Sequence, residues 1–402
     1  MKVTITPGKA EGEILAPPSK SMAHRLLMGA GLAEGISEIN NIDLSEDIKA
    51  TLGILEALGA EYRITGGTVI MTGIGNKKPK SNQVLDSKES GSTLRFFIPL
   101  ILAMGCAAEF TGAKRLFERP LGIYEEICKD QGILFHKGET GLRVDGQLKA
   151  THYKVAGNIS SQFITGLLYA LPLLEGDSVL EVLPPIESKA YIEMTMEALA
   201  TFGIKIRQEG NVYYIKGNQS YHAKDVTVEG DYSNAAFLDA FNLIGGNVSV
   251  SGLRQDSLQG DQVYKQYYAE LKSENPQMDI SECPDLGPIL MGMAAALHGA
   301  RFTGTKRLQI KESDRGAVMA EELKKFGIQV DVMENEIMVH QGDLQQPKEM
   351  LSSHNDHRIA MTMATLCTIT GGTIEGAESV KKSYPNYYEM IETLGIQVTR
   401  EV

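Results

Sequence analysis

One repeated pattern constrains the fold of this chain more than any other feature. An amphipathic helical segment is followed by a Gly after a large apolar residue and then by alternating strand-like residues, and the copies contain Gly59, Gly132, Gly203, Gly327 and Gly395. Successive glycines are separated by 73, 71, 124 and 68 residues. Gly is favoured there because a helix commonly ends on a left-handed residue. The long interval predicts a degenerate copy near residues 268–280.

A second pattern, a strand followed by a turn, recurs with the same spacing. Its six copies are segments 37–44, 109–116, 180–186, 248–255, 301–308 and 373–380. Six units of about 70 residues, each with helices and strands, predict an α/β protein built from repeats. A solenoid and a chance recurrence of helix ends are the alternatives. Short loops favour two compact domains of three units each, with a midpoint near residues 225–230.

Composition narrows the class of protein. The 402 residues are enough for two domains, and 39 Lys and Arg against 51 Asp and Glu give a net charge of −12. That balance argues against non-specific nucleic-acid or membrane-surface binding. The longest uncharged apolar run, residues 96–108, is too short to span a bilayer, and the N-terminal residues lack a signal-peptide stretch. We therefore expect a soluble cytoplasmic protein whose four separated cysteines are reduced core residues.

Basic residues occur in short polar segments along the whole chain. These segments are rich in the Ser, Gly, Pro, Asn and Asp residues that build loop ends and helix starts, and their cations are Lys20, Arg25, Arg95, Arg119, Lys311, Arg315, Arg358 and Lys382. Cations beside free backbone N–H groups hold phosphates and carboxylates. Several segments directly follow the strand-and-turn pattern, so their side chains are expected to converge on a site for small anions.

Three motifs in the first half of the chain fit such a site. PPSKSMAHR places Lys20, Ser21 and Arg25 around a helix start, as an anion cradle or as a plainly capped helix. ESGSTLRF resembles a phosphate-binding turn, with Gly91 and Ser92 before a helix. GNISSQF offers neutral donors before an apolar helix, for which an ordinary N-cap is the alternative; they are Ser160, Ser161 and Gln162.

Motifs of the second half add acids. IKESDR sets Glu312 between Lys311 and Arg315, which suits a proton donor beside an anionic substrate, although a solvated charge run is the alternative. CPDLGP offers Asp285 as a fixed acid or as a structural turn residue.

Other active-site classes find little support. HNDHRIAM contains His354 and His357, but neither CxxC nor HExxH accompanies them, which disfavours zinc. A Ser-His-Asp triad stays open, although no GxSxG elbow is present. Nucleotide-binding folds are not supported, because the chain has no GxGxxG and no Walker spacing.

The motifs together, in order, resemble the 5-enolpyruvylshikimate-3-phosphate synthase family over essentially the whole chain. They read SKSxxxR, SGSTxR, ERP, SSQF, SKxY, EGDxS, QGD, PD, KESDR, NDHRxAM and a final KSYP. The resemblance implies transfer of the enolpyruvyl (carboxyvinyl) group of phosphoenolpyruvate to the 5-hydroxyl of shikimate 3-phosphate, in chorismate and aromatic amino-acid biosynthesis. It implies no metal and no cofactor, no partner beyond the two substrates, and a monomer.

The resemblance also implies an architecture. Two similar domains would each contain three βαβαββ units arranged as an inside-out α/β barrel, with the active site in the cleft between the domains. The chain would cross twice, so that one domain comprises residues 19–228 and the other residues 1–18 with 229–402.

The resemblance assigns roles to individual residues. Asp285 would be the base, and Glu312 with Lys20 the acid. Shikimate 3-phosphate would contact Lys20, Ser21, Arg25, Ser160, Ser161, Gln162, Ser188, Tyr191, Asp285 and Lys311. Phosphoenolpyruvate would contact Lys20, Gly91, Arg119, Gln162, Arg315, Arg358 and Lys382. Arg95 would support these residues, and Gly91 implies sensitivity to glyphosate in the phosphoenolpyruvate pocket.

Two residues depart from the commonest pattern of that family. Glu89 stands where many members have Asn, and Arg307 stands where some have Asn against the shikimate phosphate. The sister family, UDP-N-acetylglucosamine enolpyruvyl transferase, is the alternative, but it usually has Lys-Asn where this chain has Lys20-Ser21, and a Cys in the loop that here reads GAKRLFERP. A non-enzymatic repeat scaffold would leave the cations unexplained.

Overall fold

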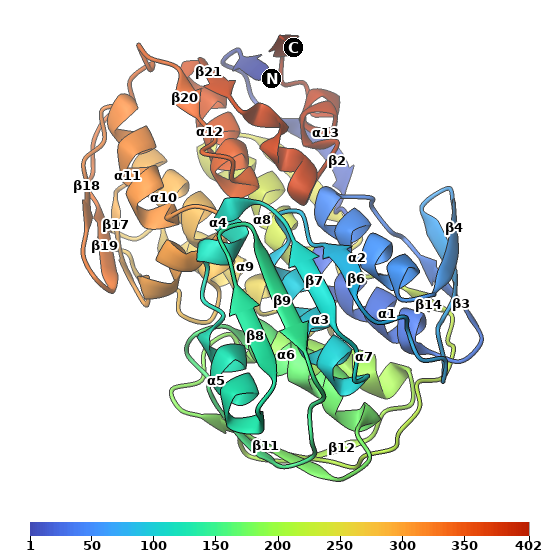
Figure 1. Ribbon diagram of the computed structural model, residues 1–402. Helices are drawn as coiled ribbons and strands as arrows, with labels where there is room; N and C mark the ends of the chain where they lie inside the picture. The colour runs from blue at the N-terminus through green and yellow to red at the C-terminus, as the bar shows by residue number, and fades with distance from the viewer. Residues whose placement is uncertain (402) are drawn as a thin grey trace. The chain divides into compact units, whose positions relative to one another are not determined.

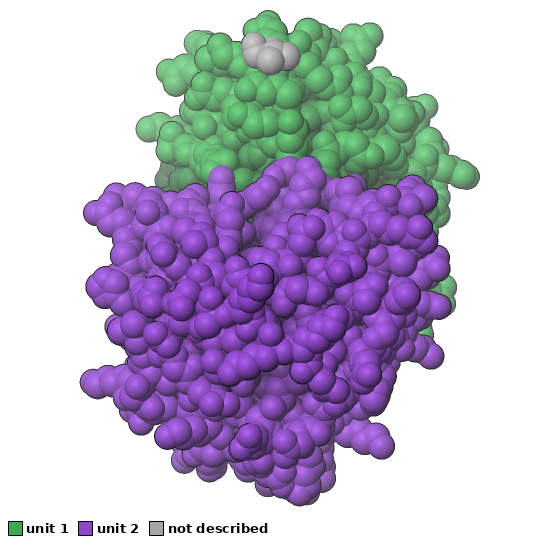
Figure 2. All heavy atoms as spheres, turned by 45° about the vertical axis from the view of Figure 1, so that its right-hand side comes forward, with its two compact units in different colours: residues 1–19, 229–402 green, residues 20–228 purple. Residues whose placement is uncertain are grey.

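The structure is a computed structural model that describes residues 1–401. The chain forms two compact units. Unit 1 comprises residues 1–19 and 229–402, and unit 2 comprises residues 20–228, as coloured in Figure 2. The chain passes between the units twice. The domain bounds implied by the family resemblance were residues 19–228 and residues 1–18 with 229–402.

Unit 2 (Figure 1) contains three four-stranded sheets with one shared pattern. The first two strands of each sheet run parallel, and the third is antiparallel to both of its neighbours. In sheet order they are β14 (Val226–Thr227), β3 (Ile36–Asn40), β5 (Thr68–Thr72) and β4 (Glu61–Thr65); β6 (Gln83–Asp86), β7 (Ala108–Thr111), β9 (Gly141–Asp145) and β8 (Leu134–Lys137); β10 (His152–Ala156), β11 (Ser178–Leu183), β13 (Val212–Ile215) and β12 (Ile206–Glu209).

Unit 1 repeats this pattern in two sheets. One is β16 (Gln277–Asp279), β17 (Ala300–Thr303), β19 (Glu336–Val339) and β18 (Val330–Val332), and the other is β20 (Leu351–Ser352), β21 (Gly372–Glu375), β1 (Lys2–Ile5) and β22 (Val398–Glu401). In the second sheet the N-terminal strand β1 occupies the third position. In the other four-stranded sheets this position is held by the second strand of the hairpin. Both ends of the described chain therefore lie in one sheet, near the N and C marks of Figure 1.

The third sheet of unit 1 is the degenerate copy. It consists of β2 (Glu11–Leu15) and β15 (Asn247–Ser251), which run parallel. The following helix, α9 (Tyr264–Glu270), ends on Leu271 in the right-handed conformation, and β16 of the next sheet follows without a hairpin. The missing hairpin explains the 124-residue interval between Gly203 and Gly327.

Each repeat carries one buried inner helix. These helices are α1 (Lys20–Leu32), α3 (Gly91–Ala103) and α6 (Ser161–Ala170) in unit 2, and α8 (Tyr232–Asp239), α10 (Gly287–Ala296) and α12 (His357–Thr370) in unit 1. Close packing explains the small residues on them. A methyl group on Gly166 would lie 2.4 Å from the Arg95 carbonyl oxygen, and one on Gly292 would lie 2.4 Å from the Thr362 methyl carbon. Among residues 1–401 the sheets stay separate and open.

A second helix in each repeat is amphipathic and partly exposed. These helices are α2 (Glu46–Ala57), α5 (Gly122–Gln131), α7 (Lys189–Thr201), α9, α11 (Arg315–Lys325) and α13 (Tyr387–Thr393); a short α4 (Lys114–Glu118) precedes α5. All but α9 and α4 are followed by one of the five repeat glycines, whose φ values lie between 67° and 106°. The left-handed glycines predicted from the repeat are confirmed.

Two expectations from composition have structural counterparts. The four cysteines are free and buried, as predicted for core residues. Within residues 1–401 no helix combines the length and the apolar character that crossing a bilayer requires.

Candidate functional site

The motif residues occupy two equivalent positions in the repeats. One is the start of an inner helix: Lys20, Gly91 and Ser161 begin α1, α3 and α6, Asp285 lies in the short 3₁₀ turn Pro284–Leu286 before α10, and Arg358 is the second residue of α12. The other is the segment after the second strand of each parallel pair, which carries Arg119, Ser188, Lys311 to Arg315, and Lys382. The repeat therefore brings residues that are distant in sequence to the same end of each unit's inner helices.

Arg25 of unit 2 is a buried cation whose hydrogen-bond partners are neutral. Its guanidinium donates to the Thr195 hydroxyl (2.9 Å), the Ser21 carbonyl (2.6 Å), the Tyr191 carbonyl (3.0 Å) and the Thr165 hydroxyl (3.4 Å). Burial lowers the pKa of Arg25 to about 10, although Tyr169 and Tyr191 act against this. A positive charge held among neutral partners is suited to an anionic ligand group.

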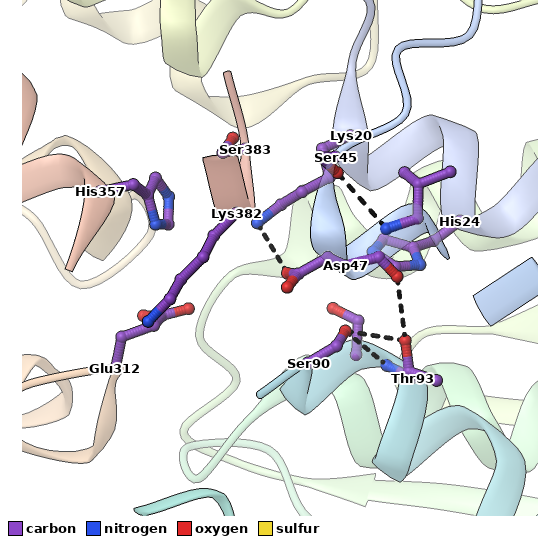
Figure 3. Close-up of polar contacts among 12 residues, drawn as sticks. Lys20, His24, Ser45, Asp47, Ser90, Thr93, Glu312, His357, Lys382 and Ser383 are labelled. Carbon is purple, nitrogen blue, oxygen red and sulfur yellow. Dashed lines mark hydrogen bonds and ion pairs between the residues drawn. The ribbon is translucent and has the colours of Figure 1, made fainter. Parts of the chain in front are cut away.

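Lys20 pairs with Asp47, an acid that sequence reasoning missed. Lys20 Nζ lies 3.0 Å from Asp47 Oδ2, and both side chains are largely buried (Figure 3). Asp47 lies in the first turn of α2, which Ser45 caps by accepting from the Ile48 amide. The Ser-Glu-Asp start of α2 signalled a capped helix, but nothing in the sequence paired it with Lys20.

Gly91 lies against the guanidinium of Arg119. A methyl group on Gly91 would lie 2.6 Å from Arg119 Nη1, so a larger residue at this position would displace the guanidinium. Ser90 caps α3 by accepting from the Thr93 amide (3.2 Å) and the Thr93 hydroxyl (2.8 Å), as Figure 3 shows. The turn expected from ESGSTLRF is therefore a capped helix start with a buried Arg beside it.

Arg95 and Gln162 link three motifs of unit 2. Arg95 donates to Gln162 Oε1 (2.8 Å) and to the Pro120 carbonyl (2.9 Å), next to Arg119. Gln162 Nε2 donates to Ser92 Oγ at 3.0 Å. This geometry supports the interpretation of Arg95 as a residue that holds Gln162 and the Arg119 segment in place.

The serines of unit 2 have different local roles. Ser160 accepts from the Gln162 amide and caps α6, so the N-cap alternative holds for its side chain. Ser161 is buried in the first turn of α6, and Ser188 is buried with a left-handed φ of 55° before α7. Tyr191 lies in that helix, with its ring centroid 5.8 Å from the Arg25 guanidinium carbon.

In unit 1 the acids gather on one buried guanidinium. Arg315 Nη1 lies 2.8 Å from Asp285 Oδ1, Nη2 lies 2.7 Å from Glu312 Oε2, and Nε lies 2.8 Å from Asp356 Oδ2. Arg315 is 1% exposed, so the solvated charge run considered for IKESDR is wrong for this residue. Asp285 and Glu312 are thereby held side by side.

Asp285 faces two further cations. Lys311 Nζ lies 3.0 Å from Asp285 Oδ1, and Arg358 Nη2 lies 3.6 Å from Oδ2. Burial opposes ionisation of Asp285, but Lys311, Arg358 and Arg315 together hold its pKa well below the usual value. Burial lowers the pKa of Lys311 to about 8, against the attraction of Asp285. The basicity of the Asp285 carboxylate therefore depends on whether these three cations also bind another anion.

The remaining cations of unit 1 are positioned by the start of α12. Arg358 donates to Ser233 Oγ at 2.7 Å, and Lys382 Nζ donates to the Asn355 carbonyl. Asp356 caps α12 by accepting from the Arg358 amide (2.9 Å) while it binds Arg315. The motif NDHRxAM included Asp356, but its pairing with Arg315 could not be read from the sequence.

Comparison with known proteins decides the family. The model of the family described as EPSP synthase (3-phosphoshikimate 1-carboxyvinyltransferase) matches residues 5–391. This chain belongs to the EPSP synthase family. A 3-phosphoshikimate 1-carboxyvinyltransferase of Clostridium kluyveri is 40% identical, with 98% of both chains covered, and one of Clostridium novyi is 39% identical, with 98% of this chain and 97% of the relative covered.

Solved structures agree on the fold. An EPSP synthase of Acinetobacter baumannii superimposes with a TM-score of 0.78 at 24% identity, covering 99% of this chain and 100% of the other. The expected α/β architecture of two repeat-built parts is thus the EPSP synthase fold. The chain is an enzyme, so the scaffold alternative is wrong.

The two departures from the commonest EPSP synthase pattern lie in different surroundings. Arg307 is buried, and its Nη1 donates to the Ser281 carbonyl at 3.3 Å. Glu89 is partly buried directly before Ser90, the cap of α3. Their contribution to substrate binding stays a prediction.

Proposed function

We propose that this enzyme transfers the carboxyvinyl group of phosphoenolpyruvate to the 5-hydroxyl of shikimate 3-phosphate and releases phosphate. The observation that carries the proposal is the pair of acids, Asp285 and Glu312, on the buried guanidinium of Arg315. Proton removal and proton donation need two such groups held close to anionic substrates. The match to the EPSP synthase family supports the same reaction.

We propose that the acceptor and the donor share Lys20 and otherwise bind different cations. Shikimate 3-phosphate is assigned to Lys20, Ser21, Arg25, Ser160, Ser161, Gln162, Ser188, Tyr191, Asp285 and Lys311. Phosphoenolpyruvate is assigned to Lys20, Gly91, Arg119, Gln162, Arg315, Arg358 and Lys382. The neutral surroundings of Arg25 and the close approach of Arg119 to Gly91 support these sets. Each substrate carries a phosphate and a carboxylate, whose charge these cations offset.

The chemical steps follow from the two acids. Asp285 takes the proton of the 5-hydroxyl group while the oxygen of that hydroxyl bonds to C2 of phosphoenolpyruvate. Glu312, assisted by Lys20, delivers a proton to the methylene carbon. The resulting tetrahedral ketal then loses phosphate with the roles reversed. Glu312 takes back a proton from the new methyl group, which restores the double bond, and Asp285 gives its proton to the departing phosphate. No step uses a metal or a cofactor, so a chelator should leave the activity unchanged.

The proposed base is regulated by its own cations. Lys311, Arg358 and Arg315 keep the pKa of Asp285 low. When anionic substrates bind these cations, their effect on Asp285 weakens and its pKa rises. Asp285 thus becomes a better base when both substrates are present, which limits proton transfer to the productive complex.

The test is a substrate-dependence assay. Phosphate release should require both phosphoenolpyruvate and shikimate 3-phosphate, and UDP-N-acetylglucosamine should not replace the latter. Sedimentation during turnover should show a monomer, the state we propose for this enzyme in the cytoplasm. Turnover with the nucleotide sugar, or none with both expected substrates, would contradict the proposal.

A further inference from the structure

Glu322, on the buried side of α11, has contacts that serve no step of the proposed reaction. The residue is 0% exposed. Its Oε1 accepts from His354 Nε2 (2.7 Å) and Lys325 Nζ (2.8 Å), and its Oε2 accepts from the Ser352 amide (3.0 Å). A buried carboxylate with three donors is held in one position. It therefore fixes the segment that carries Ser352 and His354 to α11.

That segment, residues 352–356, has an unusual backbone. His354 and Asn355 are both left-handed, with φ values of 48° and 56°, a conformation that residues other than Gly adopt rarely. The His354 amide donates to Ser352 Oγ (3.1 Å), and the Asn355 amide donates to Ser353 Oγ (3.2 Å). Two such residues in succession persist only where surrounding contacts hold them.

The segment ends on groups that position three cations. The Asn355 carbonyl accepts from Lys382. Asp356 binds Arg315 and also caps α12 by accepting from the Arg358 amide. The His354 imidazole touches none of these cations; its side-chain partners are Glu322 and, at 3.9 Å, Glu321.

We propose that His354 is a positioning residue: its contact with Glu322 fastens residues 352–356 to α11 and so sets Lys382, Arg315 and Arg358 for phosphoenolpyruvate. The proposal rests on the proposed function in one respect, that these cations bind phosphoenolpyruvate. The contact itself, and the backbone it holds, are independent of that assignment.

Charge around His354 makes the contact sensitive to pH. The hydrogen bond to Glu322 raises the pKa of His354 above its ordinary value of 6.5, against the effect of burial; Glu321 also favours the charged form, whereas Lys325 opposes it. A group whose pKa is raised in the folded state stabilises that state fully at a pH below its pKa in the unfolded chain. This stabilisation is lost as the pH rises through its pKa in the folded protein. The contact should therefore stabilise the protein most below pH 6.5 and progressively less above it.

Three variants separate positioning from general stability. His354→Ala removes the contact, His354→Gln keeps a donor for Glu322, and His340→Ala removes a comparable pair with Asp331 (2.7 Å) on the β18–β19 hairpin. For His354→Ala we expect the KM for phosphoenolpyruvate to rise about tenfold, as for a lost hydrogen bond to a charged group, with a much smaller change in kcat. His354→Gln should recover most of this loss, and His340→Ala should behave as wild type.

Two measurements that need no substrate complete the test. Amide hydrogen exchange over residues 353–358 should accelerate in His354→Ala but not in His340→Ala. The difference in Tm between wild type and His354→Gln should be larger at pH 6 than at pH 8.5. Two results would overturn the proposal and leave the proposed function intact. One is amide exchange that is unchanged in His354→Ala. The other is faster exchange in His354→Ala with an unchanged KM for phosphoenolpyruvate, while Lys382→Ala raises that KM.

If Lys382→Ala also left the KM for phosphoenolpyruvate unchanged, the assignment of these cations to phosphoenolpyruvate would be wrong. The exchange data alone would then decide whether His354 fastens residues 352–356 to α11. The ligand atoms of Glu321, Glu322 and His354 lie within 4.8 Å of one another. A rise in Tm of wild type on adding Zn²⁺, absent in His354→Gln, would overturn the proposal in favour of a metal site. The Lys325 ammonium on Glu322 disfavours that outcome.

Discussion

Two buried guanidinium groups, that of Arg25 in unit 2 and that of Arg315 in unit 1, are held in opposite ways. In unit 2, Arg25 is surrounded by hydroxyl and carbonyl oxygens. In unit 1, Arg315 binds three carboxylates, those of Asp285, Glu312 and Asp356. The first arrangement leaves a positive charge for a ligand to complete, whereas the second balances its charge within the protein.

This difference suggests that the two units contribute different functions to the reaction. A cation among neutral partners gains most when an anion binds, so unit 2 is suited to holding the acceptor through Arg25. A cation among acids holds those acids in place, so unit 1 is suited to moving protons through Asp285 and Glu312. Apart from the two-stranded sheet of β2 and β15, the repeats share one backbone pattern. The difference between Arg25 and Arg315 lies in the side chains at the helix starts and after the strands.

The largest effect is expected at Asp285. Asp285→Asn removes the proposed base and should lower kcat by roughly 10²–10⁴. Asp256→Asn is a matched control, because Asp256 is an exposed acid of the same unit that pairs with Arg254. Steady-state turnover of both variants checks this, and wild-type kcat in Asp285→Asn would remove Asp285 from the mechanism.

Arg25 should show the next largest effect, and on binding. Arg25→Gln removes a charge-assisted contact, which is typically worth about 1.5–3 kcal/mol, so the Kd for shikimate 3-phosphate should rise roughly 10- to 100-fold. Arg63→Gln, on the exposed strand β4 of the same unit, is the control. Calorimetric titration measures both, with Tm recorded because Arg25 is buried. An unchanged Kd in a folded Arg25→Gln would break the comparison between the units.

Gly91→Ala tests the contact between α3 and Arg119. The new methyl group would meet the end of a flexible side chain, so we expect the guanidinium to shift and the KM for phosphoenolpyruvate to rise about threefold to tenfold, as for a partly weakened charged contact. Gly122→Ala is the control, because a methyl group there meets nothing within 4 Å.

Glyphosate should compete with phosphoenolpyruvate in wild type and bind more weakly to Gly91→Ala. Equal inhibition of both proteins would show that Gly91 does not govern this pocket.

The smallest effect concerns pH. With a pKa of about 8, Lys311 is charged below pH 8 and loses its charge above it. The KM for shikimate 3-phosphate should therefore rise by a factor of a few between pH 7 and pH 9. Lys311→Arg keeps the charge over this range and should flatten the profile. A profile that is identical in the two proteins would assign the pH dependence to another group.

The sequence predicted the repeated architecture because the repeat is local. A helix that ends on a left-handed Gly leaves its mark within a few residues, as at Gly132 and Gly395. The starts of the three inner helices of unit 2 were predicted in the same way, around Lys20, at Gly91 and Ser92, and after Ser160. The strand β1 that closes a sheet with β22 was not predicted, because it pairs residues from opposite ends of the chain.

Charge partners were harder to predict than positions. Asp47 pairs with Lys20 across 27 residues, and Asp356 pairs with Arg315 across 41 residues, with no periodicity that relates them. The turn that holds Asp356 depends on two left-handed residues, His354 and Asn355, neither of which is Gly. Such pairings follow from tertiary packing, and only the structure shows which acid neutralises which cation.

The most direct test of the division between the units is a crossed measurement on Arg25→Gln and Asp285→Asn. The affinity for shikimate 3-phosphate, by calorimetry, and kcat at saturating substrates are determined for both variants. The account predicts that Arg25→Gln loses affinity and keeps kcat within about tenfold, whereas Asp285→Asn keeps affinity within a few-fold and loses turnover. A loss of affinity in Asp285→Asn as large as that in Arg25→Gln, or a loss of kcat in Arg25→Gln as large as that in Asp285→Asn, would contradict it.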